Sequence, residues 1–369
     1  GSFLEGIAGF GIPAMLIAPM LLTLGYKPLT CIILPLAANT TAVTFGALGT
    51  PLKIGLEIFE PDTVVKYTLL LNFIPAVLLP FLLAFLYEKT EQIKLNWFEN
   101  WKILLGAGII YAGIYIITGM FTIEYVSVIS GVSGLLIFVF LFIPKNENPS
   151  IKAWLKTFYP YFFFILLLLI ARYFLSDAYW NINQHIRTVS LYQPGAVFVF
   201  TGFLYYIFIV KRHQHTLSYI RQSKNTFHII LKPVFTILIL VCYAQIIRTD
   251  LALIAQAHLH DYSDTVKSVI NPLLGITGSF LSGSATMSNL ALGNAIQTNA
   301  ISLDNLPLLT ALLHTGSAIG NAVSLQNILM VKSVVNAPEI NYSKVLKLNA
   351  IVVGAYLLIV VIHSLILHI

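Results

Sequence analysis

The sequence has very little charge for its length. Only 10% of its 369 residues are Asp, Glu, Lys or Arg, whereas about 25% of the residues of soluble domains are charged. Hydrophobic residues make up 57% of the chain, and the mean hydropathy is +0.84. So few polar side chains could not cover a soluble domain, which excludes cytosolic enzymes, nucleic-acid-binding proteins and disulfide scaffolds. We therefore expect an all-α polytopic membrane protein whose main solvent is the lipid bilayer.

Cysteine is also scarce. Cys31 and Cys242 both lie inside apolar runs, so no disulfide is predicted. The formal net charge of +6 does not indicate a nucleic-acid partner, because membrane proteins carry excess Lys and Arg on their cytoplasmic loops. The group His258, His260 and Asp261 resembles a metal cluster, but we expect it in a solvated loop outside the membrane. No metal ion or other cofactor is predicted.

Long apolar runs predict membrane-spanning helices. Most of them reach about 16–24 residues, which is enough to cross a hydrocarbon core of about 30 Å. The four tryptophans lie just outside such runs, where indole rings prefer the level of the lipid headgroups. The predicted spans are 64–87, 103–120, 125–143, 159–174, 195–210, 233–247 and 345–367.

Four other apolar segments contain clusters of Gly, Ser, Thr and Asn near their middle. Non-helical backbone at membrane depth is tolerated only where it is buried in protein or lines a cavity. We expect segments 1–24 and 269–296 to be re-entrant hairpins, and segments 28–49 and 306–330 to be transmembrane helices that are broken within the membrane.

These segments form two similar pairs. The sequence GSFLEG at 1–6 recurs as GSFLSG at 278–283, and the Pro-Leu of the first broken helix recurs in the second. Internal repeats with paired interrupted helices are typical of secondary transporters. Basic residues between 211 and 232 mark a cytoplasmic loop, whereas the acidic residues at 57–62 and 250–264 are expected outside. The two repeats are therefore predicted to be inverted.

The repeat also predicts the organisation of the chain. Residues 1–92 would hold the remainder of the first repeat, residues 93–157 the linking transmembrane helices, and residues 158–369 the second repeat. Spanning helices precede the second hairpin, but the sequence begins at the first one. We expect a missing N-terminal part of the first repeat, on the order of 100 residues by the repeat argument.

The two hairpin tips and the two helix breaks carry the predicted substrate site. Small hydroxyl and amide side chains, free backbone N–H groups and half-helix N-termini together suit a small anion. The alternative is that Gly and Ser only allow helices to pack closely. The predicted substrate-binding residues are Glu5, Gly6, Gly9, Gly11, Asn39, Thr40, Gly49, Thr50, Ser282, Gly283, Ser284, Thr286, Ser288, Asn289, Gly316, Ser317, Gly320, Asn321 and Gln326.

Two residues are candidates for proton coupling. Glu5 is the only ionisable residue in either tip, and a carboxyl group near the membrane midplane is a functional candidate by default. The alternative is that Glu5 accepts hydrogen bonds from the loop and only holds the turn. His314, beside the second break, could also titrate, or it could be a histidine satisfied within the bundle. Lys53 could attract an anion or extend to the surface.

The motifs at these positions resemble the bacterial L-lactate permease family. They are FLEG at 3–6, AGFG at 8–11, Pro13, ANT at 38–40 and FGALGTP at 45–51, with SF at 279–280, GS at 283–284, Thr286, SN at 288–289, Gly316, Gly320, Ser324 and Gln326 in the second half. The resemblance implies a carrier in the bacterial plasma (inner) membrane for L-lactate and related 2-hydroxy monocarboxylates such as glycolate. It also implies proton symport with alternating access, and membership of a wider ion-transporter superfamily with inverted hairpins.

Two charges that the resemblance implies are absent. Ala285 stands where an Asp is expected and Asn321 where a Lys is expected, as if an interacting pair had been removed together; Leu325 also replaces an expected Pro. The substrate and the coupling ion therefore stay open, and a carrier of another small organic anion coupled to Na⁺ is the alternative.

Two further hypotheses come from other functional classes. Re-entrant loops also build channels. An intramembrane hydrolase would use Ser284 or Ser288 as nucleophile and His314 as base, but the sequence contains no Gly-x-Ser-x-Gly motif. The oligomeric state is not predicted.

Overall fold

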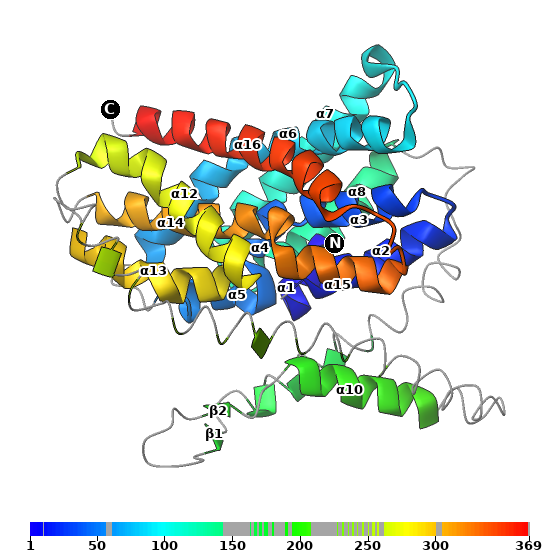
Figure 1. The fold of residues 1–369 in the computed structure, drawn as a ribbon, viewed down its shortest axis with the longest axis horizontal. Helices are drawn as coiled ribbons and strands as arrows, with labels where there is room; N and C mark the ends of the chain where they lie inside the picture. Colours follow the sequence, from blue (N-terminus) through cyan, green and yellow to red (C-terminus); the bar gives the residue numbers. More distant parts are fainter. Residues whose placement is uncertain are drawn as a thin grey trace. The chain divides into compact units, whose positions relative to one another are not determined.

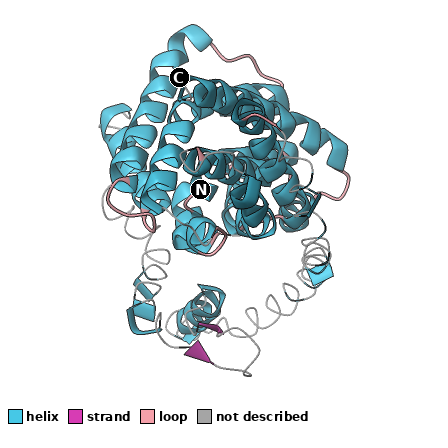
Figure 2. Cartoon of the chain, turned by 90° about the vertical axis from the view of Figure 1, so that its left-hand side faces the viewer, coloured by secondary structure: helices cyan, strands magenta, loops and turns pink. Residues whose placement is uncertain are grey.

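The computed structural model describes residues 1–9, 11–56, 61–142, 262–299 and 305–367, together with 179–180, 189–190, 194–207 and scattered helical positions between 163 and 257. The chain divides into two compact units, one made of Gly1–Phe142 and Ile229–Ile369 and the other of Ile143–His228. Helices make up nearly all of the described part of the first unit (Figures 1 and 2).

The first interrupted apolar segments form five short helices, which we call the first set (residues 2–53). Their bounds are α1 (Ser2–Ala8), α2 (Ile12–Thr23), α3 (Pro28–Ala38), α4 (Thr40–Val43) and α5 (Gly46–Lys53). The turn between α1 and α2 needs glycine, because Gly9 and Gly11 have φ of 63° and 75°. Pro13 lies in the first turn of α2, where its missing N–H costs nothing. The predicted breaks near Gly9 and Asn39 are confirmed.

The second interrupted segments form the second set (residues 264–335). It consists of α12 (Asp264–Ser282), α13 (Ala285–Asn299), α14 (Leu306–Gly320), the 3₁₀ helix η2 (Asn321–Val323) and α15 (Leu325–Val335). Gly283 ends α12 in a left-handed conformation, with φ of 70°. Ser324 caps α15 by accepting a hydrogen bond from the backbone N–H of Asn327 at 3.3 Å. The predicted breaks near Gly283 and Asn321 are also confirmed.

Four further helices, which lack such breaks, are described in the first unit. They are α6 (Pro61–Glu91), α7 (Trp97–Gly119), α8 (Val126–Phe142) and α16 (Tyr342–Leu367). The predicted start of α7 at residue 103 is wrong, because the helix already begins at Trp97. The polar residues Glu99, Asn100 and Lys102 interrupt the apolar run but not the helix.

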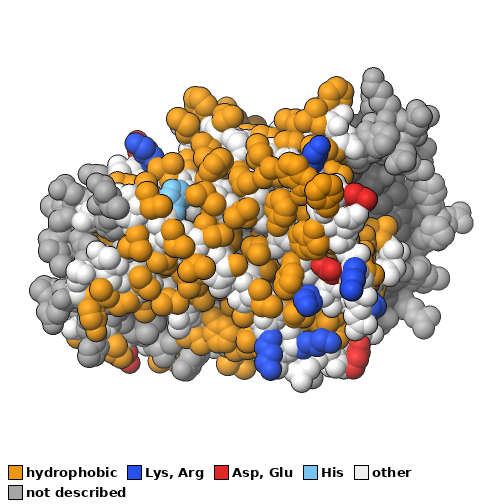
Figure 3. Space-filling model, turned by 90° about the horizontal axis from the view of Figure 1, so that it is seen from above, with side chains coloured by type: hydrophobic (Ala, Val, Ile, Leu, Met, Phe, Trp, Pro, Cys, Tyr) orange, Lys and Arg blue, Asp and Glu red, His pale blue; other side chains and the backbone are white. Residues whose placement is uncertain are grey.

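Within the described part of the chain, four helical stretches are long and apolar enough to cross a membrane. They are Asp62–Glu91, Trp97–Gly119, Leu306–Val335 and Tyr342–Leu367. Large apolar side chains on α7 and α16 are exposed, among them Ile109, Ile117, Leu358, Ile362 and Ile366. Figure 3 shows one face of the molecule on which hydrophobic side chains cover most of the described surface. These exposed faces suit a multi-pass membrane protein, since lipid takes the place of water around them.

The central helix of the first unit is α14, which packs against α6, α12, α13 and α16. All of its residues from Pro307 to Gly320 are buried. Glycines at the contact allow α14 to approach α12 closely. A Cβ on Gly275 would collide with the backbone of Leu313 and Ser317, and a Cβ on Gly316 would collide with Pro272. The small residues of these two helices thus bring the second break into the middle of the bundle.

In the unit Ile143–His228, the structure describes α10 (Pro194–Tyr205) and a short antiparallel strand pair, β1 (Tyr179–Trp180) and β2 (Val189–Ser190). The strand pair was not predicted from the sequence. Most of the predicted spans at 159–174 and 233–247, the basic loop at 211–232 and the His258–His260–Asp261 group lie outside the described residues. The division into residues 1–92, 93–157 and 158–369 stays a prediction.

Candidate functional site

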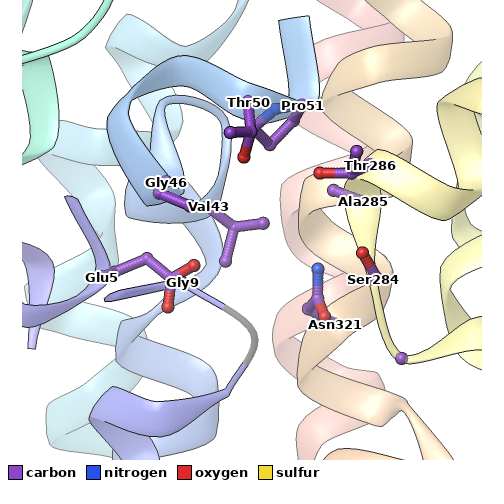
Figure 4. Close-up of a pocket in the computed structure, with 12 residues that line it drawn as sticks. Glu5, Gly9, Val43, Gly46, Thr50, Pro51, Ser284, Ala285, Thr286 and Asn321 are labelled. Carbon is purple, nitrogen blue, oxygen red and sulfur yellow. The ribbon is translucent and has the colours of Figure 1, made fainter. Parts of the chain in front are cut away.

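A small cavity lies where the first and second sets meet (Figure 4). It leaves about 20 Å³ for the centre of a water-sized molecule, which is room for roughly one water. The sets therefore close tightly around it in this conformation. The lining residues are Glu5, Gly9, Val43, Gly46, Ala47, Thr50, Pro51, Gly283, Ser284, Ala285, Thr286 and Asn321.

Glu5 is the only ionisable residue among those that line the cavity. Its side chain comes from the middle of α1 and is only 2% exposed. The amide nitrogen Nδ2 of Asn39, at the break between α3 and α4, donates a hydrogen bond of 2.6 Å to Glu5 Oε2. A Cβ on Gly46 would lie 2.6 Å from Glu5 Oε1, so only glycine leaves room for the carboxylate at this point. The break between α3 and α4 thus holds the carboxylate of Glu5 on α1 in place.

The backbone of Ala47, Leu48 and Gly49 is left-handed, with φ of 45°, 58° and 77°. This conformation costs about 1–2 kcal/mol for each residue that is not glycine, so surrounding contacts must hold it in place. On one side, the Cβ of Ala47 would lie 2.6 Å from a Cβ placed on Gly9. The tip between α1 and α2 therefore packs directly against this left-handed turn.

The second set holds the carbonyl groups on both flanks of the left-handed turn. His314 Nε2 lies 2.9 Å from the carbonyl oxygen of Thr44, and Asn289 Nδ2 donates a 2.9 Å hydrogen bond to the carbonyl oxygen of Pro51. Because a carbonyl oxygen can only accept, Nε2 of His314 carries the proton. Asn289 Nδ2 then donates its second hydrogen to His314 Nδ1, also at 2.9 Å. Nε2 of the buried ring thus joins the two sets directly, whereas Nδ1 bonds within the second set to Asn289, whose amide also bonds to the first set.

This geometry gives no support to the serine hydrolase hypothesis. Neither ring nitrogen of His314 is bonded to a serine. Ser288 Oγ instead donates to the carbonyl oxygen of Gly275 at 3.0 Å, and Ser284 Oγ accepts from the backbone N–H of Met287 at 3.3 Å. A nucleophile needs a hydrogen bond to its base, and these residues do not provide one.

The second break presents an amide to the cavity. Asn327 Nδ2 donates to Asn321 Oδ1 at 2.8 Å. The nitrogen of the Asn321 amide donates to the carbonyl oxygen of Ser317 at 3.4 Å, and in Figure 4 it points toward the cavity. Ala285 lines the same cavity. The two positions where the family resemblance implies opposite charges therefore lie around one small space. Their joint replacement by Ala285 and Asn321 leaves that space without a cation.

A buried network joins both breaks to the uninterrupted helices. The hydroxyl of Tyr356 on α16 donates to Asn72 Oδ1 on α6 at 2.6 Å, so Thr41 Oγ1, which lies 2.9 Å away, must donate to that hydroxyl. Asn72 Nδ2 donates to Thr315 Oγ1 at 3.1 Å. Thr41 belongs to α4 and Thr315 to α14, so α6 and α16 tie the two sets together behind the cavity.

The structure brings seven of the predicted binding residues to the cavity: Glu5, Gly9, Thr50, Gly283, Ser284, Thr286 and Asn321. Asn39 and Asn289 bond to lining residues. The remaining predicted residues support the surrounding fold or packing: Gly6, Gly11, Thr40, Gly49, Ser282, Ser288, Gly316, Ser317, Gly320 and Gln326. Lys53 lies outside the cavity and pairs with Glu124.

Five lining residues were not among the predicted binding residues: Val43, Gly46, Ala47, Pro51 and Ala285. Three of them belong to the motif FGALGTP, from which only the glycine at 49 and the threonine at 50 were selected. The motif as a whole was the sequence signal that could have identified these three residues. Asn327, Asn72 and Tyr356 were also missed, and nothing in their local sequence marks them.

The chain is similar to known transport proteins. The family model described as L-lactate permease matches residues 1–149 and 149–369. A Haemophilus influenzae protein named "Putative L-lactate permease" is 25% identical over 90% of this chain and 72% of its own length. The L-lactate permease of Streptococcus iniae is 27% identical, over 79% of this chain and 66% of its own length.

A third relative extends the comparison to another named substrate. The glycolate permease GlcA of Escherichia coli is 32% identical, but the match covers only 41% of this chain and 28% of that protein. All three relatives are named permeases, so the chain is similar to transporters and not to enzymes. No solved structure matches the chain.

Proposed function

Because the chain belongs to the L-lactate permease family, we propose that it carries L-lactate and related small 2-hydroxy monocarboxylates such as glycolate across the bacterial plasma membrane by proton symport. The observation that carries the proposal is the small cavity between the two sets, where one buried carboxyl group lies among hydroxyl and amide groups of both sets. The names of the relatives support the substrate class.

The cavity suits an anion only when Glu5 is protonated. No Lys, Arg or His is among the described residues that line it, so no basic side chain of this lining offsets a second negative charge. Two negative charges about 4 Å apart repel by about 4 kcal/mol at an effective dielectric constant of 20. This penalty, roughly a thousandfold in affinity, links anion binding to the uptake of one proton. The start of α13, with Ser284 and Thr286, offers N–H and O–H donors to the substrate carboxylate.

Asn39 is suited to follow the protonation state of Glu5. Its Nδ2 donates to the carboxylate, while its Oδ1 is buried without a hydrogen-bond partner. When Glu5 takes up a proton, a half-turn of the amide places Oδ1 where it accepts the new O–H. The same side chain therefore stabilises both charge states, which a proton carrier requires.

Alternating access completes the proposal. In it, α1–α2 and α12–α13 are re-entrant hairpins of two inverted repeats that approach the cavity from opposite sides of the membrane. The cavity has room for about one water, so it would have to widen for a substrate molecule to enter. Opening toward either side would have to break contacts between the sets, among them the bonds of His314 and Asn289.

Uptake of labelled L-lactate by the complete protein in proteoliposomes tests this function. We expect saturable accumulation that needs an inward proton gradient, collapses with a protonophore, and is inhibited by glycolate. Accumulation driven only by a sodium gradient would support the alternative of a Na⁺-coupled anion carrier. An ohmic current would point to a channel, and the absence of any flux would contradict transport of this substrate.

A further inference from the structure

Thr50 carries a buried hydroxyl group that the protein itself does not use. Its Oγ1 has no hydrogen-bond partner, although a threonine hydroxyl can donate one hydrogen bond and accept two. The backbone carbonyl oxygen of the same residue is engaged, because it accepts from the N–H groups of Ile54 at 2.9 Å and Gly55 at 3.2 Å. A buried polar atom without a partner in a native structure calls for an explanation.

The position of Thr50 supplies a reason. It lines the cavity one residue after the left-handed turn Ala47–Gly49, and in Figure 4 its Oγ1 points into the space that it shares with Thr286. Two other polar groups of the cavity already have partners: Glu5 Oε2 accepts from Asn39, and the Asn321 oxygen accepts from Asn327. Thr50 thus offers an unused hydrogen-bonding group on the wall opposite the second break.

A 2-hydroxy monocarboxylate has one polar group more than a simple acid. In the proposed function, the substrate carboxylate accepts hydrogen bonds from the start of α13, and the proton on Glu5 removes the negative charge that would repel it. Its 2-hydroxyl group then needs a separate partner that can both donate and accept. We propose that the Thr50 hydroxyl binds the 2-hydroxyl group of the substrate and thereby selects 2-hydroxy acids over acids that lack this group. This assignment rests on the proposed function.

The selection follows from the cost of an unpaired group. A propionate molecule in the site of a lactate molecule would leave the Thr50 hydroxyl buried without a partner, and a site built to bind a hydroxyl group rejects such an analogue. A 2-oxo acid such as pyruvate should be intermediate, because its ketone oxygen accepts from Thr50 but cannot donate. The order of preference is therefore lactate, then pyruvate, then propionate.

Substitutions of Thr50, each tested with an acid that has the 2-hydroxyl group and one that lacks it, test the assignment. In the complete protein we compare Thr50→Val, which keeps the shape but loses the hydroxyl, with Thr50→Ser, which keeps the hydroxyl. The matched control is Thr68→Val on α6: Thr68 is buried and its hydroxyl also lacks a partner, but it does not line the cavity. For each variant, the inhibition constants of L-lactate and propionate are measured against labelled lactate uptake.

We expect Thr50→Val to lower the preference for lactate over propionate by about 2- to 13-fold, the contribution of one neutral hydrogen bond. Thr50→Ser and Thr68→Val should keep the wild-type ratio. A Thr50→Val variant that binds both acids more weakly by the same factor would overturn the assignment, since the residue would then only shape the cavity.

A second measurement, of ligand binding, applies if a variant folds but does not transport. The rise in melting temperature on adding lactate or propionate to purified protein reports binding alone. An unchanged difference between the two acids in Thr50→Val would again overturn the assignment. If the wild-type protein neither bound nor transported lactate, the proposed function itself would fail, and that result is distinguishable because it does not depend on Thr50.

Discussion

Replacing His314 by alanine should weaken the contact between the first and second sets. The ring is completely buried and spans two hydrogen bonds of 2.9 Å, one to the carbonyl oxygen of Thr44 and one from the amide of Asn289. Without the ring, a buried carbonyl group and a buried N–H group lose their partners. The left-handed turn at Ala47–Gly49 then loses one of the two contacts that hold its flanks.

The size of the effect follows from these two bonds. A hydrogen bond between membrane helices contributes about 0.6 kcal/mol on average and up to about 1.7 kcal/mol. Two of them give about 1–3 kcal/mol, and the volume left by the ring adds a cavity term. The coupling between His314 and Asn289 alone, measured by a double-mutant cycle, should be about 0.6–1.7 kcal/mol.

The assay is thermal unfolding of the purified protein for His314→Ala, Asn289→Ala and the double variant. His363→Ala is the matched control, because this histidine is only partly buried, lies in α16 and has no partner for its Nδ1 atom. We expect a clear loss of stability for His314→Ala and a much smaller one for His363→Ala. Equal losses, or strictly additive effects of His314 and Asn289, would refute the reasoning.

Gly46→Ala should displace the Glu5 carboxylate and lower uptake of labelled lactate strongly, because the new Cβ would lie 2.6 Å from Glu5 Oε1; Gly113→Ala on α7, where nothing lies within 4 Å, should leave uptake unchanged. Equal uptake by both variants would speak against the tight fit around Glu5. For the inverted repeats, a cysteine at Lys224 should be labelled only from the cytoplasm and one at Asp261 only from outside. Labelling of both from the same side would contradict the inverted arrangement.

The positions of the breaks could be predicted from the sequence because their causes are local. Glycines at 9, 11 and 283 allow positive φ, and polar residues such as Asn39 and Asn321 interrupt apolar runs. The left-handed turn at Ala47–Leu48 could not be predicted, since Ala and Leu disfavour this conformation and only tertiary contacts impose it.

The partners of the site residues depend on the folded arrangement. His314 was recognised as a candidate, but the sequence alone could not decide between a titrating and a satisfied histidine, because its partner Thr44 is 270 residues away. Val43 lines the cavity although an apolar side chain gives no signal of a site. Asn327 orients Asn321 from the next helix, and only the packing of η2 against α15 brings them together.

The central claim is that Glu5 carries the coupled proton, and Glu5→Gln tests it most directly. The neutral amide resembles the protonated, substrate-loaded side chain, and Asn39 can still bond to it because an amide both donates and accepts. Exchange of labelled for unlabelled lactate and accumulation driven by a proton gradient are measured in the same vesicles of the complete protein. The account predicts that accumulation is lost while exchange is at least partly kept. Full accumulation in the Glu5→Gln variant would contradict it, and a parallel loss of both activities with lower thermal stability would mean that Glu5 only holds the turn.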